Sequence, residues 1–126
     1  MSEHMIPVRD RCGPHCVAPD EGERLFDEVL GAMREGKLVS LDFSGVETIT
    51  SAFLNVAIGR LYGQLDVAVV DDRLRWEGVD EADSRLISLV VGNAKHYYKQ
   101  SLAERERDAR IVNETAAKNR WQSPRN

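Results

Sequence analysis

The sequence is poor in the features that mark several large protein classes. It has only two cysteines, Cys12 and Cys16, and its longest apolar runs fall well short of the ~20 residues that a membrane-spanning helix needs. The first ten residues contain no apolar core of the kind found in secretion signals. We therefore expect a cytoplasmic protein without a membrane segment, in which both thiols stay reduced.

A strongly basic composition is also missing. The chain has 17 Lys and Arg against 21 Asp and Glu, which gives a net charge of -4. Nucleic-acid-binding proteins need a dense basic surface to displace the counterions around phosphates, so we expect no nucleic-acid partner. The sequence contains neither a phosphate-binding loop nor a glycine-rich dinucleotide motif, and we therefore expect no nucleotide site and no cofactor.

What is present suits one small domain followed by a charged tail. Of the 126 residues, 42% are hydrophobic and 30% are charged, which is typical of chains that bury a core without disulfides or metals. Residues 101–118 carry many charges around a thin apolar stripe. We expect residues 1–100 to form the domain and residues 101–126 to form a tail, helical at first and then disordered.

Hydrophobic periodicity predicts alternating helices and strands, and therefore an α/β fold. Residues 37–43 are expected to form a central strand covered on both sides, because apolar residues occupy both of its faces. Helices are expected at residues 20–35, 51–62 and 80–99. The third should bury a stripe consisting of Leu86, Leu89, Val90, Ala94 and Tyr97.

Other segments give weaker local signals. Pro7 restricts residues 6–8 to an edge strand, and the turn after it predicts a hairpin that returns through Cys16 and Val17. Asp20, with Glu23 three residues later, predicts an N-terminal helix cap. Residues 65–74 favour a strand by propensity, although the same residues also fit a short helix with an apolar face.

A more specific pattern lies around residues 41–59. A strand that ends in Asp-Phe leads through a Gly-Val turn to a helix start that contains Ser and Phe. Residues 13–26 and the Asn-Ala-Lys-His-Tyr-Tyr run at residues 93–98 add further matches. Over residues 6–98 the chain resembles the small bacterial STAS-like domains of unknown function, which are distantly similar to anti-sigma-factor antagonists.

This resemblance implies a STAS-like fold, with a small sheet packed against helices and, here, a charged C-terminal helical extension. It also implies that residues 65–74 are helical and precede a short strand, against their local propensity. Its functional implication is a regulatory protein-binding module and not an enzyme. The implied partner is a protein, and specifically an ATPase or serine kinase of the GHKL type.

Anti-sigma-factor antagonists are switched by phosphorylation at a helix start. By residue matching, the customary acceptor position falls on Ala52, which has no hydroxyl. Ser51 and Thr50 are therefore the candidate phospho-acceptors, and unpaired amides at this helix start would favour a phosphate. The alternative is that one of them is simply the N-cap, which contributes about 1 kcal/mol to stability.

Four further residues are candidates for partner binding. Asp42 and Gly45 flank the turn, whereas Asn55 and Arg60 lie off the apolar stripe of the predicted second helix. The simpler interpretation of Asp42 is that its carboxylate accepts hydrogen bonds from the turn. For Asn55 and Arg60 the alternative is an ordinary solvated helix face.

Two competing functions remain open. Cys12, His15 and Cys16 would suit a thiol-dependent or metal-dependent protein, but a zinc site needs about four ligands and the sequence offers no second cluster. We therefore expect a plain turn here, with a buried Cys16 and no metal. The other alternative is a structural subunit that associates through its C-terminal helix, for example as a homodimer.

Overall fold

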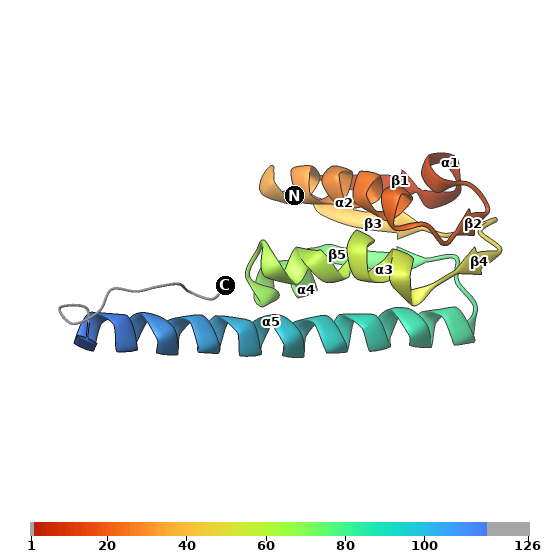
Figure 1. Ribbon diagram of the computed structural model, residues 1–126. Helices are drawn as coiled ribbons and strands as arrows, with labels where there is room; N and C mark the ends of the chain where they lie inside the picture. Colours follow the sequence, from red (N-terminus) through yellow and green to blue (C-terminus); the bar gives the residue numbers. More distant parts are fainter. Residues whose placement is uncertain (1, 116–126) are drawn as a thin grey trace. The chain divides into compact units, whose positions relative to one another are not determined.

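The computed structural model describes residues 2–115, including the side chains of residues 2–99. The chain divides into two compact units, residues 1–95 and 96–126, which are described separately. The first unit contains a three-stranded sheet, a second two-stranded sheet and most of the helices (Figure 1). The helix α5 (Glu81–Thr115) begins in the first unit and continues into the second.

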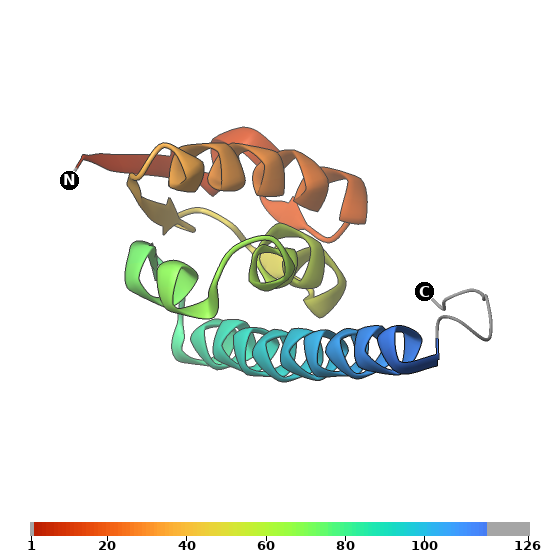
Figure 2. The same ribbon diagram turned by 90° about the vertical axis from the view of Figure 1, so that its left-hand side faces the viewer.

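The main sheet consists of β1 (Glu3–Pro7), β3 (Leu38–Asp42) and β5 (Leu74–Glu77), all parallel, with β3 in the centre. Figures 1 and 2 show α2 on one side of β3 and α4 on the other. Val39 and Leu41 are completely buried. The prediction of a central strand covered on both faces is confirmed. In the register, Glu3 lies opposite Leu38 and Val39 opposite Leu74.

The remaining elements connect these strands and cover them. Parallel strands need a crossover between them, and here the crossovers contain helices. The structure is therefore α/β, as expected. The elements are α1 (Val8–Cys12), β2 (His15–Cys16), α2 (Pro19–Arg34), β4 (Thr48–Ile49), α3 (Ser51–Ala57), the 3-10 helix η1 (Gly59–Gly63) and α4 (Val67–Arg73).

The long helix α2 starts one residue earlier than predicted. Pro19 occupies its first turn, Ala18 is the N-cap, and no side chain caps it. The predicted cap formed by Asp20 and Glu23 is therefore wrong, because proline already suits the first helical position and lacks the amide that would need a partner. The helix ends at Arg34, one residue before the predicted end, and Gly36 follows it with φ +84°.

Helix α3 packs tightly against α2 at Gly22. A Cβ atom at this glycine would lie 2.9 Å from the carbonyl oxygen of Phe53 and 3.2 Å from Cβ of Val56. Phe53 and Leu54 are fully buried beneath this contact. The absent side chain at position 22 therefore fixes where α3 begins relative to the core.

The predicted hairpin through Cys16 and Val17 is wrong. After β1 the chain forms α1, whose Val8 and Cys12 are buried, and then β2, which pairs in parallel with β4. The register places His15 opposite Thr48. A parallel pair of two-residue strands is too short to produce an alternating pattern in the sequence, which is why the turn signal was misleading.

Residues 65–74 adopt the helical structure that the family resemblance implied. Helix α4 and then β5 follow one another directly, although the residues have a high strand propensity. Only Val70 of α4 is fully buried, and Val67 is 37% exposed. The helix therefore presents one narrow apolar stripe to β3 and η1, and tertiary packing overrides local propensity here.

Helix α5 is capped by Asp80, whose Oδ1 accepts a hydrogen bond from the amide of Asp83 at 2.8 Å. Its buried stripe agrees with the prediction at Val90 and Ala94, whereas Leu89 and Tyr97 are 60% and 62% exposed. Residues 86–91 are mostly apolar, so periodicity alone did not choose the phase. The buried residues are Ile87, Val90, Val91 and Ala94.

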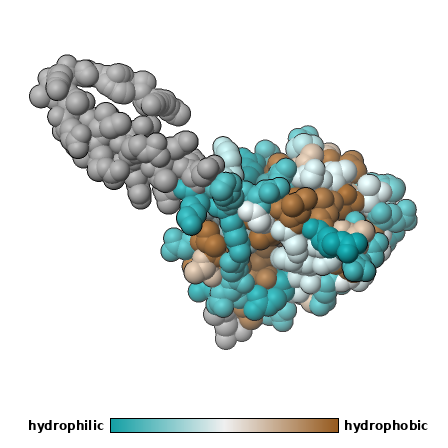
Figure 3. All heavy atoms as spheres, turned by 90° about the horizontal axis from the view of Figure 1, so that it is seen from below, coloured by the Kyte–Doolittle hydropathy of each residue, from teal (hydrophilic) through white to brown (hydrophobic). Residues whose placement is uncertain are grey.

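Seen with α5 foremost, hydrophobic side chains gather in patches between hydrophilic ones (Figure 3).

The helical extension expected beyond residue 100 is present as far as Thr115. Residues 116–126, for which disorder is expected, lie outside the described residues. In the part of the chain that the structure describes, no helix combines the length and the apolar character that crossing a membrane requires.

Candidate functional site

Residues 42–55 form a strand end, a turn and a helix start on the surface of the first unit. This arrangement agrees with the prediction from the sequence. Between its buried side chains, this segment exposes short groups of residues to solvent. The exposed residues are Ser44, Gly45, Glu47, Thr48, Ser51, Ala52 and Asn55.

The strand end is held by Asp42. Its Oδ1 accepts a hydrogen bond from the amide of Ser44 at 3.0 Å. Hydrogen bonds from the Ser44 hydroxyl and amide hold the pKa of the Asp42 carboxyl below its ordinary value, because they favour its charged form. The adjacent amide, that of Phe43, donates to the carbonyl of Glu77 at 2.9 Å. Asp42 thus acts as a loop-ordering acceptor.

Two glycines allow the turn to approach its neighbours. Gly78 has φ +79°, and a Cβ atom there would lie 2.7 Å from the Ser44 amide nitrogen. Gly45 has φ +82°, and a Cβ atom there would lie 2.7 Å from Cδ of Arg9. Asp42 and Gly45 therefore lie beside Arg9 and Gly78 at the carboxyl ends of the parallel strands, the edge where α/β proteins usually bind ligands. No sequence pattern indicates a role for Arg9.

The helix start is built around Thr50. It is the N-cap of α3, and its Oγ1 accepts a hydrogen bond from the amide of Phe53 at 3.2 Å. The same hydroxyl donates to the carbonyl of Val17 at 3.3 Å. Ser51 is the first residue of the helix and is exposed. The two candidate phospho-acceptors are therefore not equivalent, because the Thr50 hydroxyl is already used twice.

Backbone hydrogen bonds to the segment around β2 occupy three amides that precede the helix start. The carbonyl of Pro14 accepts hydrogen bonds from the amides of Glu47 at 2.7 Å and Thr48 at 3.1 Å. The carbonyl of Cys16 accepts one from the amide of Thr50 at 3.2 Å. These bonds occupy amides that precede the helix start, and the amides of Ser51 and Ala52 in the first turn of α3 are not among them. The prediction that amides at this helix start favour a phosphate stays a prediction.

Asn55 and Arg60 are both exposed, but they lie on different elements. Asn55 is on α3, whereas Arg60 is on η1, because the predicted second helix changes to 3-10 geometry after Ala57. Nη1 of Arg60 lies 3.5 Å from Oε2 of Glu23, and its guanidinium is 5.4 Å from the centroid of the Phe26 ring. Both contacts are with α2, and they hold the arginine beside α3.

Comparison with protein families agrees with this geometry. The family model of a STAS-like domain of unknown function matches residues 21–84, which include most of α2 and all of β3, the exposed segment, α3 and β5. The chain belongs to this family. The family resemblance noted in the sequence is thereby confirmed. No curated protein and no solved structure matches the chain.

In this STAS-like domain the histidine of the Cys-x-x-His-Cys segment does not join the cysteines. Nδ1 of His15 lies 3.0 Å from Oγ1 of Thr48, which bridges β2 and β4. Cys12 and Cys16 are both buried and free. Among the residues that the structure describes, no group of three or more His, Cys, Asp or Glu side chains is arranged to hold a metal ion.

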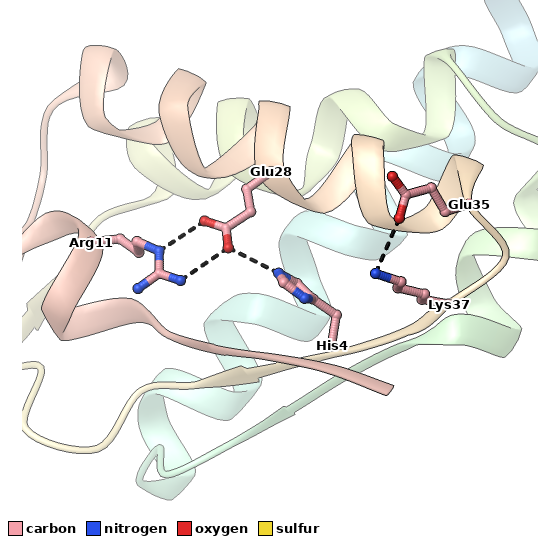
Figure 4. A network of polar contacts seen from close by, with 5 residues as sticks. All are labelled: His4, Arg11, Glu28, Glu35 and Lys37. Carbon is pink, nitrogen blue, oxygen red and sulfur yellow. Dashed lines mark hydrogen bonds and ion pairs between the residues drawn. The ribbon is translucent and has the colours of Figure 1, made fainter. Parts of the chain in front are cut away.

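A polar network, which no sequence pattern predicted, holds β1 and α1 against α2. Nε of Arg11 donates to Glu28 at 2.9 Å, and Nε2 of His4 lies 2.9 Å from the same carboxylate (Figure 4). These contacts, chiefly that with Arg11, hold the pKa of Glu28 below its ordinary value. They connect β1 and α1 to α2, and they thereby position the chain that leads into β2.

Proposed function

We propose that this STAS-like domain is a regulatory protein-binding module and not an enzyme. Its docking surface consists of the exposed residues Ser44, Gly45, Glu47, Thr48, Ser51, Ala52, Asn55 and Arg60. The observation that carries the proposal is that this exposed segment is fixed to the domain by backbone hydrogen bonds to Pro14 and Cys16. A surface that is already ordered loses less conformational entropy when a partner binds.

The chemistry of the docking surface suits protein recognition. Its side chains are mostly small and polar, with Glu47 and Arg60 providing one charge of each sign. Arg60 is partly ordered before binding by Glu23 and by the ring of Phe26. Arginine is a residue type that protein interfaces favour, and here it is exposed and already positioned.

The proposed partner is an ATPase or serine kinase of the GHKL type. This choice rests on the resemblance of the STAS-like family to anti-sigma-factor antagonists, which bind such kinases. The present domain would supply the docking surface, while the kinase would supply the ATP site. Because the kinase would bind the ATP, this chain needs no nucleotide-binding motif of its own.

If the partner phosphorylates this domain, we propose Ser51 as the acceptor and not Thr50. The Thr50 hydroxyl caps α3 and contacts Val17, so its modification would disrupt the helix start. The Ser51 hydroxyl is exposed in the first turn, where negative charge is favourable. A phosphate there would add nearly two negative charges to the docking surface and weaken partner binding.

The proposal is tested by titrating the purified protein against a panel of purified GHKL-type serine kinases. We expect one of them to bind, and Asn55→Arg to weaken binding by at least about tenfold, as expected for a bulky charge in an interface core. Asn93→Arg is the matched control, because Asn93 is also exposed on a helix but lies outside the docking surface. Failure of the whole panel to bind folded protein, or equal loss in both variants, would refute the proposal.

A further inference from the structure

The two buried thiols lie on the segment that supplies the backbone hydrogen-bond acceptors of the docking surface. Cys12 is the last residue of α1, and Cys16 lies in β2. Sγ of Cys12 is 3.7 Å from the carbonyl oxygen of Glu21, and Sγ of Cys16 is 3.6 Å from that of Gly13. The Cys16 sulfur thus lies against the carbonyl of the residue that directly follows Cys12, and Gly13 itself has φ +83°. This places the two thiols on the same short turn.

The two thiols have different surroundings. When Cys12 ionises, the Cys16 S–H group turns to donate to the thiolate, and Arg24 and Arg11 also favour the negative charge. Together these groups lower the pKa of Cys12. Bonding to Cys12 and burial raise the pKa of Cys16, so it remains a thiol. Cys12 is also the less enclosed of the two, 6% exposed against 0%.

Glu21 opposes this ionisation. Its carboxylate disfavours negative charge on both sulfur atoms. Its Oε1 is buried and has no hydrogen-bond partner among the described residues, so the carboxylate is not neutralised by a nearby donor at that atom. The charges of two arginines therefore favour ionisation of Cys12, and the charge of one carboxylate opposes it.

We propose that Cys12 and Cys16 are an oxidation site, at which a hydroperoxide converts the two thiols into a disulfide that loosens the docking surface. The Cys12 thiolate attacks the O–O bond of hydrogen peroxide, which gives a sulfenic acid on Cys12 and one water. The Cys16 sulfur then attacks the sulfur of the sulfenic acid, forming the S–S bond and releasing a second water. Peroxide is reduced, and the two thiol hydrogens leave in the water.

The segment between the cysteines connects this chemistry to the docking surface. Pro14 lies between them, and its carbonyl accepts the hydrogen bonds from Glu47 and Thr48. The carbonyl of Cys16 itself accepts the bond from Thr50. Disulfide formation draws the sulfur atoms to about 2.05 Å, and the backbone of residues 12–16 must move with them. The functional consequence rests on the proposed docking function, whereas the chemistry does not.

The chemistry is tested on the full chain with hydrogen peroxide and intact-mass spectrometry under denaturing conditions. We expect the monomer to lose two hydrogen atoms and to regain them after reduction. Cys16→Ser should stop at a sulfenic acid on Cys12 that dimedone traps, and Cys12→Ser should yield no such adduct. Oxygen addition without a disulfide in the wild-type protein, disulfides only between chains, or unreacted thiols under conditions that oxidise the denatured chain would overturn the proposal.

Substitutions beside the thiols separate this proposal from a generally accessible cysteine pair. Glu21→Gln should accelerate disulfide formation about fivefold, since removing a nearby negative charge favours the thiolate. Arg24→Gln should slow it. If both variants match the wild-type rate while their circular dichroism spectra show folded protein, the assigned roles of these residues are wrong.

The link to the docking surface has its own readout. Oxidation should increase hydrogen exchange at the amides of Glu47, Thr48 and Thr50 at least about tenfold, and reduction should reverse the increase, because these amides lose their acceptors. Unchanged exchange in a fully oxidised sample would overturn the claim that the disulfide loosens the docking surface. It would not affect the claim that the two cysteines are an oxidation site. Neither measurement needs a partner, so both outcomes are distinguishable from a failure of the proposed docking function.

Discussion

The two parallel pairings in this domain differ in what holds them. The central strand β3 of the main sheet is enclosed, and Val39 and Leu41 are completely buried. The β2–β4 pairing joins two residues with two, and it is held by bonds to Pro14 and Cys16 close to the surface. Local stability varies within a fold in this way, and binding regions are usually drawn from its weaker parts. The main sheet therefore supports the domain, while β2–β4 positions the docking surface.

The largest effect should come from the core of the main sheet. Leu41→Ala should lower the free energy of unfolding by about 2–5 kcal/mol, because it removes a fully buried side chain and leaves a cavity. Urea denaturation measures this loss. Val17→Ala, next to β2 and 42% exposed, is the comparison variant and should cost less than about 0.5 kcal/mol. Similar losses in the two variants would remove the distinction between the two pairings.

The next effect concerns the contact between β5 and the turn. Gly78→Ala should cost about 2–3 kcal/mol, since alanine disfavours φ +79° and its Cβ would meet the Ser44 amide at 2.7 Å. Gly31→Ala is the control, because that glycine lies within α2 with open space around it. The control should be stabilising by about 0.5–1 kcal/mol. A loss at position 31 equal to that at position 78 would show that the argument from the contact is wrong.

A smaller effect is expected at the start of α3. Thr50→Ala should lower stability by about 1 kcal/mol through loss of the N-cap, whereas Ser51→Ala should change it by less than about 0.5 kcal/mol. Thermal unfolding compares the two. Hydrogen exchange at the Phe53 amide should rise in the first variant alone, because Thr50 is its acceptor. The opposite order would assign the cap to Ser51 and remove the reason for choosing it as acceptor.

The smallest effect should appear in acid. The pKa of Glu28 is lower in the folded protein than its ordinary value of 4.5, so its contribution is present above about pH 4.5 and is lost as pH falls through the folded pKa. Glu28→Gln should remove this part of the acid dependence, about 0.5 kcal/mol for a partly exposed ion pair. Denaturant titrations at several pH values measure it. Glu35→Gln, at a more exposed pair with Lys37, should leave the slope unchanged.

Sequence reasoning succeeded where a pattern extended over many residues. The strand at 38–42 and the helix after Pro19 were found because each carries several apolar residues at its own period. The two-residue strands β2 and β4 are too short to show any period, so the pairing that fixes the docking surface was missed. Residues 65–74 were assigned correctly only through the family resemblance.

The individual side chains of the site were harder to place. Thr50 and Ser51 are equally good cap residues by type, and only the backbone geometry shows that Thr50 is the N-cap. Arg9 lies over Gly45 through a tertiary contact for which the sequence has no signal. The buried stripe of α5 was predicted correctly at Val90 and Ala94 but not at Leu89, because the apolar run at 86–91 offers more than one helical face.

The most direct test of the central claim is hydrogen exchange of the domain with and without a GHKL-type kinase that binds it. The account predicts that the kinase slows exchange in residues 44–55 and leaves β1 and α4 unchanged. Protection confined to other elements, with residues 44–55 exchanging as in the free protein, would contradict it.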